Sequence, residues 1–174
     1  MYRRFAEILI WVDKQMDKGG TFLIVLGGSV IALTVFLQVL LRYVFKHPLF
    51  GLEEFSRLVA VWVYFIGAIY GTREESHVFG DVARMIFKTP RASAILRFIA
   101  SLFILITCII FTIYSYEYTL WLYGTGERTT GLWWPRVISV SSMLFGAVFM
   151  TGYCLVKTVT YSRKFFLLRD QIGE

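Results

Sequence analysis

Histidine and cysteine are the residues through which a small membrane chain most often binds a haem or a metal, and this chain has two of each. His47 and His77 lie in different hydrophilic segments, on opposite sides of the membrane in the topology that the charges predict, so they cannot share one ligand site. Cys108 and Cys154 lie in separate apolar runs, where each is expected to pack as a small buried hydrophobic residue. We therefore predict no enzyme activity, no cofactor and no metal in this chain.

Charged residues gather at the two ends of one apolar run, Leu58 to Thr72. Two carboxylates, Glu53 and Glu54, precede it in a predicted first helical turn, where the helix dipole favours them, and Arg57 is spaced to pair with either. We expect this group either to orient the helix as an ion pair or to dock a partner. A second charged group follows the run: Arg73, Glu74, Glu75, His77 and Asp81. Of these, Arg73, His77 and Asp81 are expected to form a hinge at the far end of the helix.

Membrane-spanning helices must position these groups, because a composition of 57% hydrophobic and 17% charged residues is too apolar for an ordinary soluble protein. About 20 apolar residues in a helix cross a hydrocarbon core of about 30 Å. Four runs approach this length, and the second must extend into charged residues at its ends. We predict an all-α membrane protein, one integral membrane domain over residues 1–174, with four transmembrane helices at about 21–41, 54–74, 98–118 and 137–157.

The segment before the first span is amphipathic. Apolar residues such as Phe5, Leu9 and Met16 recur at helical spacing, with charged residues on the other side. This pattern predicts an amphipathic interfacial helix at about 3–18, and Gly19 and Gly20 would turn the chain into the bilayer. A second short surface helix is expected to begin at Asp81 and to end before Pro90.

Lysine and arginine are distributed unevenly between the hydrophilic segments. Thirteen lie before the first span, between the second and third, and after the fourth, whereas five lie in the other two loops. The positive-inside rule therefore places both termini in the cytoplasm. The net charge of +6 is explained by this orientation and by attraction to phospholipid, so we expect no nucleic-acid partner.

The centres of the four spans contain no ionisable residue. A protein that conducts a solute by itself usually places such residues near the midplane of the membrane. Gly67 and Gly71 form a GxxxG step in the second span, which would allow a helix of this chain or of a partner to approach closely. The sequence therefore favours an accessory subunit over an autonomous carrier.

The densest pattern covers residues 41–81, which read LRYVFKHPLFGLEEFSRLVAVWVYFIGAIYGTREESHVFGD. This segment resembles the small membrane (Q) subunit of tripartite ATP-independent periplasmic (TRAP) transporters. It contains an RYVF end of the first helix, a proline-containing loop, an EE-x-x-R helix start, a V-W-x-x-F-x-G core and an R-E-x-x-H-V-x-x-D exit, in the order of that family. The fourth span departs from the family pattern, since Ser141, Ser142 and Gly146 replace the expected proline-glycine step. With the GxxxG step, the motifs give these candidate interface and helix-orienting residues: Arg42, Glu53, Glu54, Arg57, Trp62, Gly67, Gly71, Arg73, His77 and Asp81.

The resemblance implies a division of labour between subunits. A chain of this family is a non-catalytic small permease subunit of the bacterial inner membrane. It braces a large, elevator-type membrane subunit that would hold sodium and an organic acid, and its outward loops help dock a periplasmic solute-binding protein. The residues alone leave two other interpretations open: a small membrane redox or quinone-binding subunit, suggested by the aromatic residues and cysteines, and a self-associating four-helix channel, suggested by the GxxxG step.

Overall fold

The computed structural model describes residues 2–47, 49, 51–86 and 90–170, and the side chains of 19–47, 49, 51–73 and 95–162. This part of the chain forms four helices: α1 (Tyr2–Tyr43), α2 (Leu52–Ile86), α3 (Pro90–Thr125) and α4 (Val137–Asp170). Each helix contains a segment long and apolar enough to cross a membrane, namely Gly19–Tyr43, Leu52–Arg73, Ile95–Thr125 and Val137–Ser162. The predicted all-α class with four membrane-spanning helices is confirmed.

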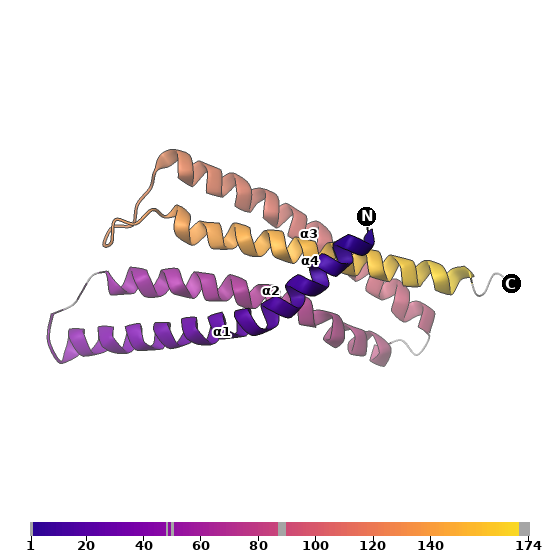
Figure 1. Cartoon of the computed structure of the whole chain (residues 1–174), viewed down its shortest axis with the longest axis horizontal. Helices are drawn as coiled ribbons and strands as arrows, with labels where there is room; N and C mark the ends of the chain where they lie inside the picture. The colour runs from indigo at the N-terminus through magenta and orange to yellow at the C-terminus, as the bar shows by residue number, and fades with distance from the viewer. Residues whose placement is uncertain (1, 48, 50, 87–89, 171–174) are drawn as a thin grey trace.

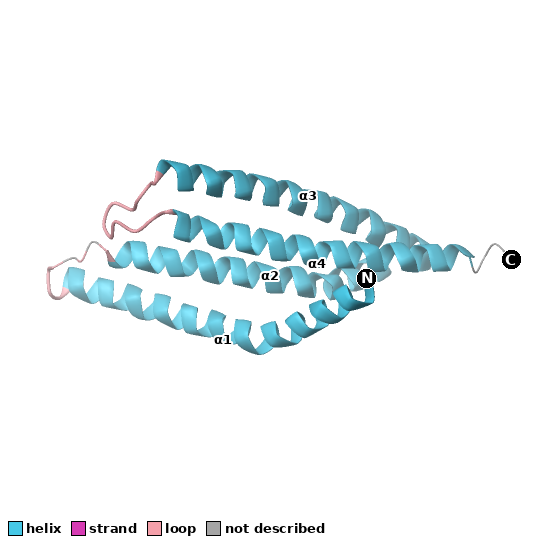
Figure 2. Ribbon diagram, turned by 45° about the horizontal axis from the view of Figure 1, so that its top comes forward, coloured by secondary structure: helices cyan, strands magenta, loops and turns pink. Residues whose placement is uncertain are grey.

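The first helix is longer than the predicted first span, because it continues through Gly19 and Gly20 without interruption. Figure 2 shows α1 changing direction part-way along its length, which glycine residues within a helix permit. The side chains of residues 1–18 lie outside the described residues. The amphipathic surface helix at about 3–18 therefore stays a prediction, as does the cytoplasmic location of the termini.

The expectation of a separate surface helix beginning at Asp81 is wrong. Helix α2 continues through this position to Ile86, since the segment after Arg73 contains no proline that would interrupt helical hydrogen bonding. Helix α2 ends at Ile86, before Pro90 as expected, and Pro90 itself begins α3. Proline is well suited to a first helical position because the missing N–H would have no intrahelical acceptor there.

The helices lie side by side in the spatial order α1, α2, α4, α3 (Figures 1 and 2). In the part of the chain that the structure describes, α1 packs against α2 alone, whereas α2 also packs against α4, and α4 against α3. The α1–α2 connection and the α3–α4 loop, residues 126–136, lie at one end of this row, which we name the loop end. Helices α2 and α4 consequently run in the same direction, and this pair forms the centre of the row.

Helices α3 and α4 pack through small and weakly polar side chains. Ser115 of α3 is fully buried. The hydroxyl oxygens of Thr112 and Thr151 lie 2.8 Å apart, and the Thr158 hydroxyl donates to the Ser101 carbonyl at 3.2 Å. Lipid tails are as apolar as leucine, so close packing of small residues and hydrogen bonds between helices drive association in a membrane. This interface has both.

Candidate functional site

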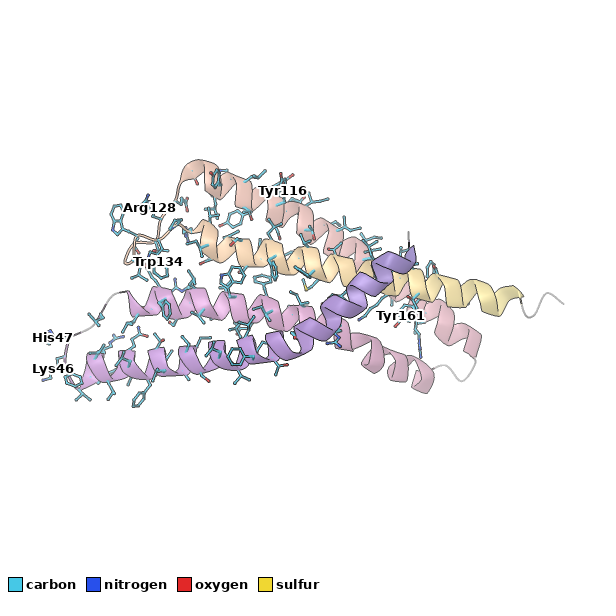
Figure 3. All side chains as sticks on the ribbon, viewed as in Figure 1. Lys46, His47, Tyr116, Arg128, Trp134 and Tyr161 are labelled. Atoms are coloured by element: carbon cyan, nitrogen blue, oxygen red, sulfur yellow. The ribbon has the colours of Figure 1, made fainter. Side chains whose placement is uncertain are left out.

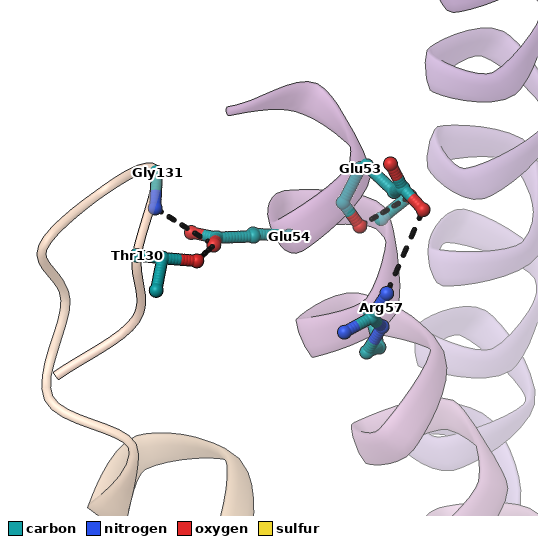
Figure 4. A network of polar contacts seen from close by, with 6 residues as sticks. Glu53, Glu54, Arg57, Thr130 and Gly131 are labelled. Carbon is teal, nitrogen blue, oxygen red and sulfur yellow. Dashed lines mark hydrogen bonds and ion pairs between the residues drawn. The ribbon is translucent and has the colours of Figure 1, made fainter. Parts of the chain in front are cut away.

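The start of α2 carries the two predicted carboxylates, and they point in different directions (Figure 4). Glu53 lies beside Arg57, with 3.6 Å between Glu53 Oε1 and Arg57 Nη2. These side chains are 67% and 71% exposed, and an ion pair so exposed contributes little to stability. Of the two pairings that the sequence allowed for Arg57, the structure forms the one with Glu53.

Glu54 binds the α3–α4 loop, a contact that the sequence did not predict. Its Oε1 accepts hydrogen bonds from the Thr130 hydroxyl at 3.0 Å and from the Gly131 N–H at 2.8 Å. Its Oε2 accepts one from the Leu132 N–H at 2.8 Å. Hydrogen bonds to an ionised carboxylate are shorter and stronger than those between neutral groups. One side chain of α2 thus holds three successive loop residues, and we name this contact the loop-end tie.

The α3–α4 loop is itself folded as a small hairpin. The Thr129 N–H donates to the Trp134 carbonyl at 2.9 Å, and the Arg136 N–H donates to the Glu127 carbonyl at 3.0 Å. The side chains of Arg136 and Glu127 also form an ion pair of 2.9 Å. Figure 3 shows Arg128 and Trp134 at the loop end of the molecule. Glu54 therefore fixes a loop with defined backbone structure.

Two apolar contacts supplement the loop-end tie. The side chain of Leu132 covers Gly51, where an added Cβ would lie 2.6 Å from Leu132 Cδ2. The ring of Phe55 meets that of Trp134 edge-on, with 6.4 Å between the ring centroids. Such an aromatic pair adds about 0.5–1.5 kcal/mol beyond its buried area. The first turns of α2 and the α3–α4 loop consequently form one structural unit.

Trp62, a predicted interface residue, is turned toward α4. Its indole Nε1–H donates to the Ile138 carbonyl at 3.2 Å, and its ring lies 6.1 Å from that of Phe145, measured between centroids. Further along α2, Phe65 packs on Gly146, where an added Cβ would lie 2.8 Å from the Phe65 ring. Gly146, at the position where the family pattern departs, therefore allows α2 and α4 to approach closely.

At the other end of the row, α4 in turn contacts the backbone of α2. The Lys157 ammonium donates to the carbonyl oxygens of Thr72 and Arg73, the latter at 3.0 Å. These carbonyls lie where the apolar part of α2 ends. Because α2 continues to Ile86, the ammonium binds carbonyls within a helix rather than at its end. We name this contact the opposite-end tie. The sequence contains one signal for this contact, a single lysine at the end of the apolar run 137–156.

Gly67 and Gly71 were predicted to allow a close helix approach, and within the described residues they contact no other helix closely. An added Cβ on either would have no atom of another element within 4 Å. The close approaches occur at other glycines: an added Cβ would overlap Tyr70 at Gly20 and Val63 at Gly27. No described residue therefore covers the GxxxG face of α2 closely.

The other candidates lie apart from these ties. The Arg42 guanidinium lies over the ring of Tyr43, 5.8 Å from its centroid. The side chains of His77 and Asp81 lie outside the described residues. Within the described part of the chain, no three histidine, cysteine, aspartate or glutamate side chains are grouped to hold a metal ion. The contacts that the structure does bring together are suited to fixing helices and a loop in one register.

The sequence from residue 31 to residue 164 matches the family model described as the DctQ component of tripartite ATP-independent periplasmic transporters. The chain belongs to this family. The resemblance found in residues 41–81 is thereby confirmed, and the matched region of this DctQ-family chain includes both ties and the α3–α4 loop. Four apolar helices together with the family make it a multi-pass protein of the inner membrane.

Relatives of this DctQ-family chain are found in Haemophilus influenzae. Two are named as TRAP transporter small permease proteins: one is 37% identical over 46% of this chain and 49% of its own length. The other is 28% identical over 79% of this chain and 86% of its own length. The sialic acid TRAP transporter permease protein SiaT is 40% identical over 36% of this chain and 9% of its own length. The chain thus matches about half of the first relative, and no solved structure matches it.

Proposed function

We propose that the chain is the non-catalytic small permease subunit of a sodium-coupled TRAP transporter for an organic acid. It braces a large, elevator-type membrane subunit and helps to dock a periplasmic solute-binding protein. Family membership supports the place in the transporter. Sodium coupling and the substrate class rest on the family resemblance, and sialic acid, for which one relative is named, is itself a carboxylic acid.

The observation that carries the bracing role is the fixed register of α2 and α4. Glu54 of α2 accepts hydrogen bonds at one end of the pair, Trp62 of α2 donates one further along, and Lys157 of α4 donates at the other end. A helix pair joined at both ends resists sliding along its length. Such a pair suits a static support, beside which another subunit moves its substrate site.

A large membrane partner is supported by one relative in particular. The segment of SiaT that is similar to this chain makes up 9% of that permease protein. In that relative, a segment like this one is therefore joined covalently to a much longer chain. The same association without the covalent link is what we propose here.

We infer that the loop end faces the periplasm, because the basic residues gather in the segments at the other end. This orientation presents the α3–α4 hairpin, with Arg128 and Trp134, to an exported solute-binding protein. It also brings the basic segments to the anionic phospholipid of the cytoplasmic leaflet.

The GxxxG face of α2 is the proposed contact with the large subunit. Tyr64 is 77% exposed there, and Gly67 and Gly71 leave space for the backbone of another helix to approach. Replacing Gly67 by leucine should leave this chain folded but reduce the yield of the complex with the large subunit. Ala32→Leu, on an exposed position of α1, is the matched control and should leave that yield unchanged.

The proposed function is tested by reconstitution. The chain alone, the large subunit alone and both together are placed in liposomes with a sodium gradient, the binding protein and a labelled organic acid. We expect uptake only when both membrane subunits are present, in a one-to-one complex. Uptake by the chain alone, or self-association with no large partner, would contradict the proposal.

A further inference from the structure

The two cysteines of the chain meet in the membrane-spanning part of the structure. Cys108 of α3 and Cys154 of α4 have 3.7 Å between their Sγ atoms. Cys154 is buried, with 4% of its surface exposed, and Cys108 is half-buried at the edge of the interface. The two thiols, 46 positions apart in the sequence, are therefore in van der Waals contact.

The surrounding interface holds the two thiols at the same level. On one side, the hydroxyls of Thr112 and Thr151 lie 2.8 Å apart, and on the other, the Thr158 hydroxyl donates to the Ser101 carbonyl. Both contacts join α3 to α4, so the helices cannot easily separate or slide at the cysteines. A disulfide has about 2.05 Å between its sulfurs, so the thiols need to approach by only about 1.7 Å.

We propose that Cys108 and Cys154 form an oxidation site, at which hydrogen peroxide converts the two thiols to a disulfide that joins α3 to α4. Peroxide is small and neutral, so it can enter the lipid-facing edge of the interface, where the half-buried Cys108 is the more accessible thiol. The buried Cys154 is then the resolving thiol, already in contact with the sulfur that reacts first.

The reaction is balanced by one peroxide molecule. The Cys108 sulfur attacks a peroxide oxygen, the O–O bond breaks, and sulfenic acid and water form. The Cys154 sulfur then attacks the Cys108 sulfur, the S–O bond breaks, and a second water leaves. Two sulfurs are each oxidised by one electron, two peroxide oxygens are reduced, and both thiol protons end in water. The disulfide closes a covalent ring from Cys108 to Cys154, which includes the α3–α4 loop.

The test uses the full chain in membrane vesicles, treated with hydrogen peroxide and then digested with trypsin. Cleavage after Arg97, Arg128, Arg136 and Lys157 places the cysteines on peptides 98–128 and 137–157. We expect mass spectrometry to find these peptides joined, and dithiothreitol to separate them. Cys154→Ser should abolish the joined peptide, with Cys108 accumulating as sulfenic acid.

A displaced pair serves as the matched control. In Cys108→Ser/Thr112→Cys, the new thiol lies one helical turn away and faces Thr151 instead of Cys154. Its cross-linking to Cys154 should be about tenfold slower or more, because proximity sets the effective concentration of the second thiol. Equal rates in both proteins, a disulfide that joins two chains, or oxidation of Cys108 without a cross-link in the native sequence would each overturn the proposal.

Discussion

The two ends of the α2–α4 pair are held by opposite charges that bind opposite kinds of backbone group. At the loop end, the carboxylate of Glu54 accepts hydrogen bonds from the N–H groups of Gly131 and Leu132. At the opposite end, the ammonium of Lys157 donates to the carbonyls of Thr72 and Arg73. In both cases the side chain comes from one helix, and the backbone it binds belongs to the element beside it.

The backbone groups bound at the two ends differ in which other hydrogen-bond partners are available to them. Thr72 and Arg73 lie within α2, where helical N–H groups further along the chain are available to their carbonyls. Gly131 and Leu132 lie in a loop, where no regular structure supplies acceptors for their N–H groups. The loop therefore depends on Glu54 more than α2 depends on Lys157, and this difference orders the expected effects of substitution.

The largest effect is expected at the loop end. Glu54→Ala removes the acceptor of three hydrogen bonds and should release the α3–α4 loop, exposing Arg128 to protease. Trypsin cleavage after Arg128 should become about tenfold faster, because cleavage follows the population of locally open molecules. Glu53→Ala is the matched control, since the neighbouring carboxylate pairs with exposed Arg57 and not with the loop, and it should leave the rate unchanged. Equal acceleration in both variants would show that the loop does not depend on Glu54.

A smaller effect is expected at the opposite end. Lys157→Met keeps the length of the side chain but removes the donor to Thr72 and Arg73. Amide hydrogen exchange in the segment that follows Arg73 should accelerate by about threefold, since the helix retains its own hydrogen bonds there. Lys157→Arg, which keeps a donor and the charge, should exchange like the native protein. If the methionine variant also exchanged at the native rate, the opposite-end tie would have no role in ordering α2.

Local features of the sequence were enough to predict the four spanning helices. Apolar run length is a property of contiguous residues, and it identifies helices of the size that a bilayer requires. The spacing of neighbouring residues was also enough to predict that Arg57 pairs with Glu53 or Glu54, but it could not indicate which of the two. The choice depended on a loop 76 to 78 positions further along, whose N–H groups bind Glu54.

The glycines also show that a local sequence pattern does not identify contacts between distant segments. The GxxxG spacing drew attention to Gly67 and Gly71, yet among the described glycines the close helix approaches occur at Gly20, Gly27 and Gly146. A glycine supports close packing only where a neighbouring side chain lies opposite, as Val63 does for Gly27 and Phe65 for Gly146. The sequence could not indicate this, because the spatial order α1, α2, α4, α3 is set by contacts between distant segments.

A modest loss of stability is expected between the two ends. Trp62→Phe keeps an aromatic ring against Phe145 but removes the N–H that donates to the Ile138 carbonyl. One such hydrogen bond contributes about 1 kcal/mol, which corresponds to a fall in Tm of about 3 °C for a chain of this size. Trp121→Phe is the control, because the exposed Trp121 stacks on Tyr118 of its own helix, α3. If the Tm of Trp62→Phe were no lower than that of the control, the hydrogen bond to Ile138 would have no role in fixing α2 against α4.

The smallest effect is expected at the other carboxylate of the loop end. Arg57→Gln breaks the ion pair with Glu53, whose two side chains are 71% and 67% exposed. Water solvates both charges in the variant, so the loss should be about 0.5 kcal/mol or less by thermal unfolding. A role for Arg57 in docking would appear elsewhere, as a weaker complex with the large subunit or the solute-binding protein. Arg57→Glu is the sharper variant, because it reverses the charge beside Glu53 while leaving the hydrogen bonds of Glu54 in place. If assembly and uptake both survive that reversal, the conspicuous pair at the start of α2 has no partner role, and its less conspicuous neighbour Glu54 is the residue that organises this end.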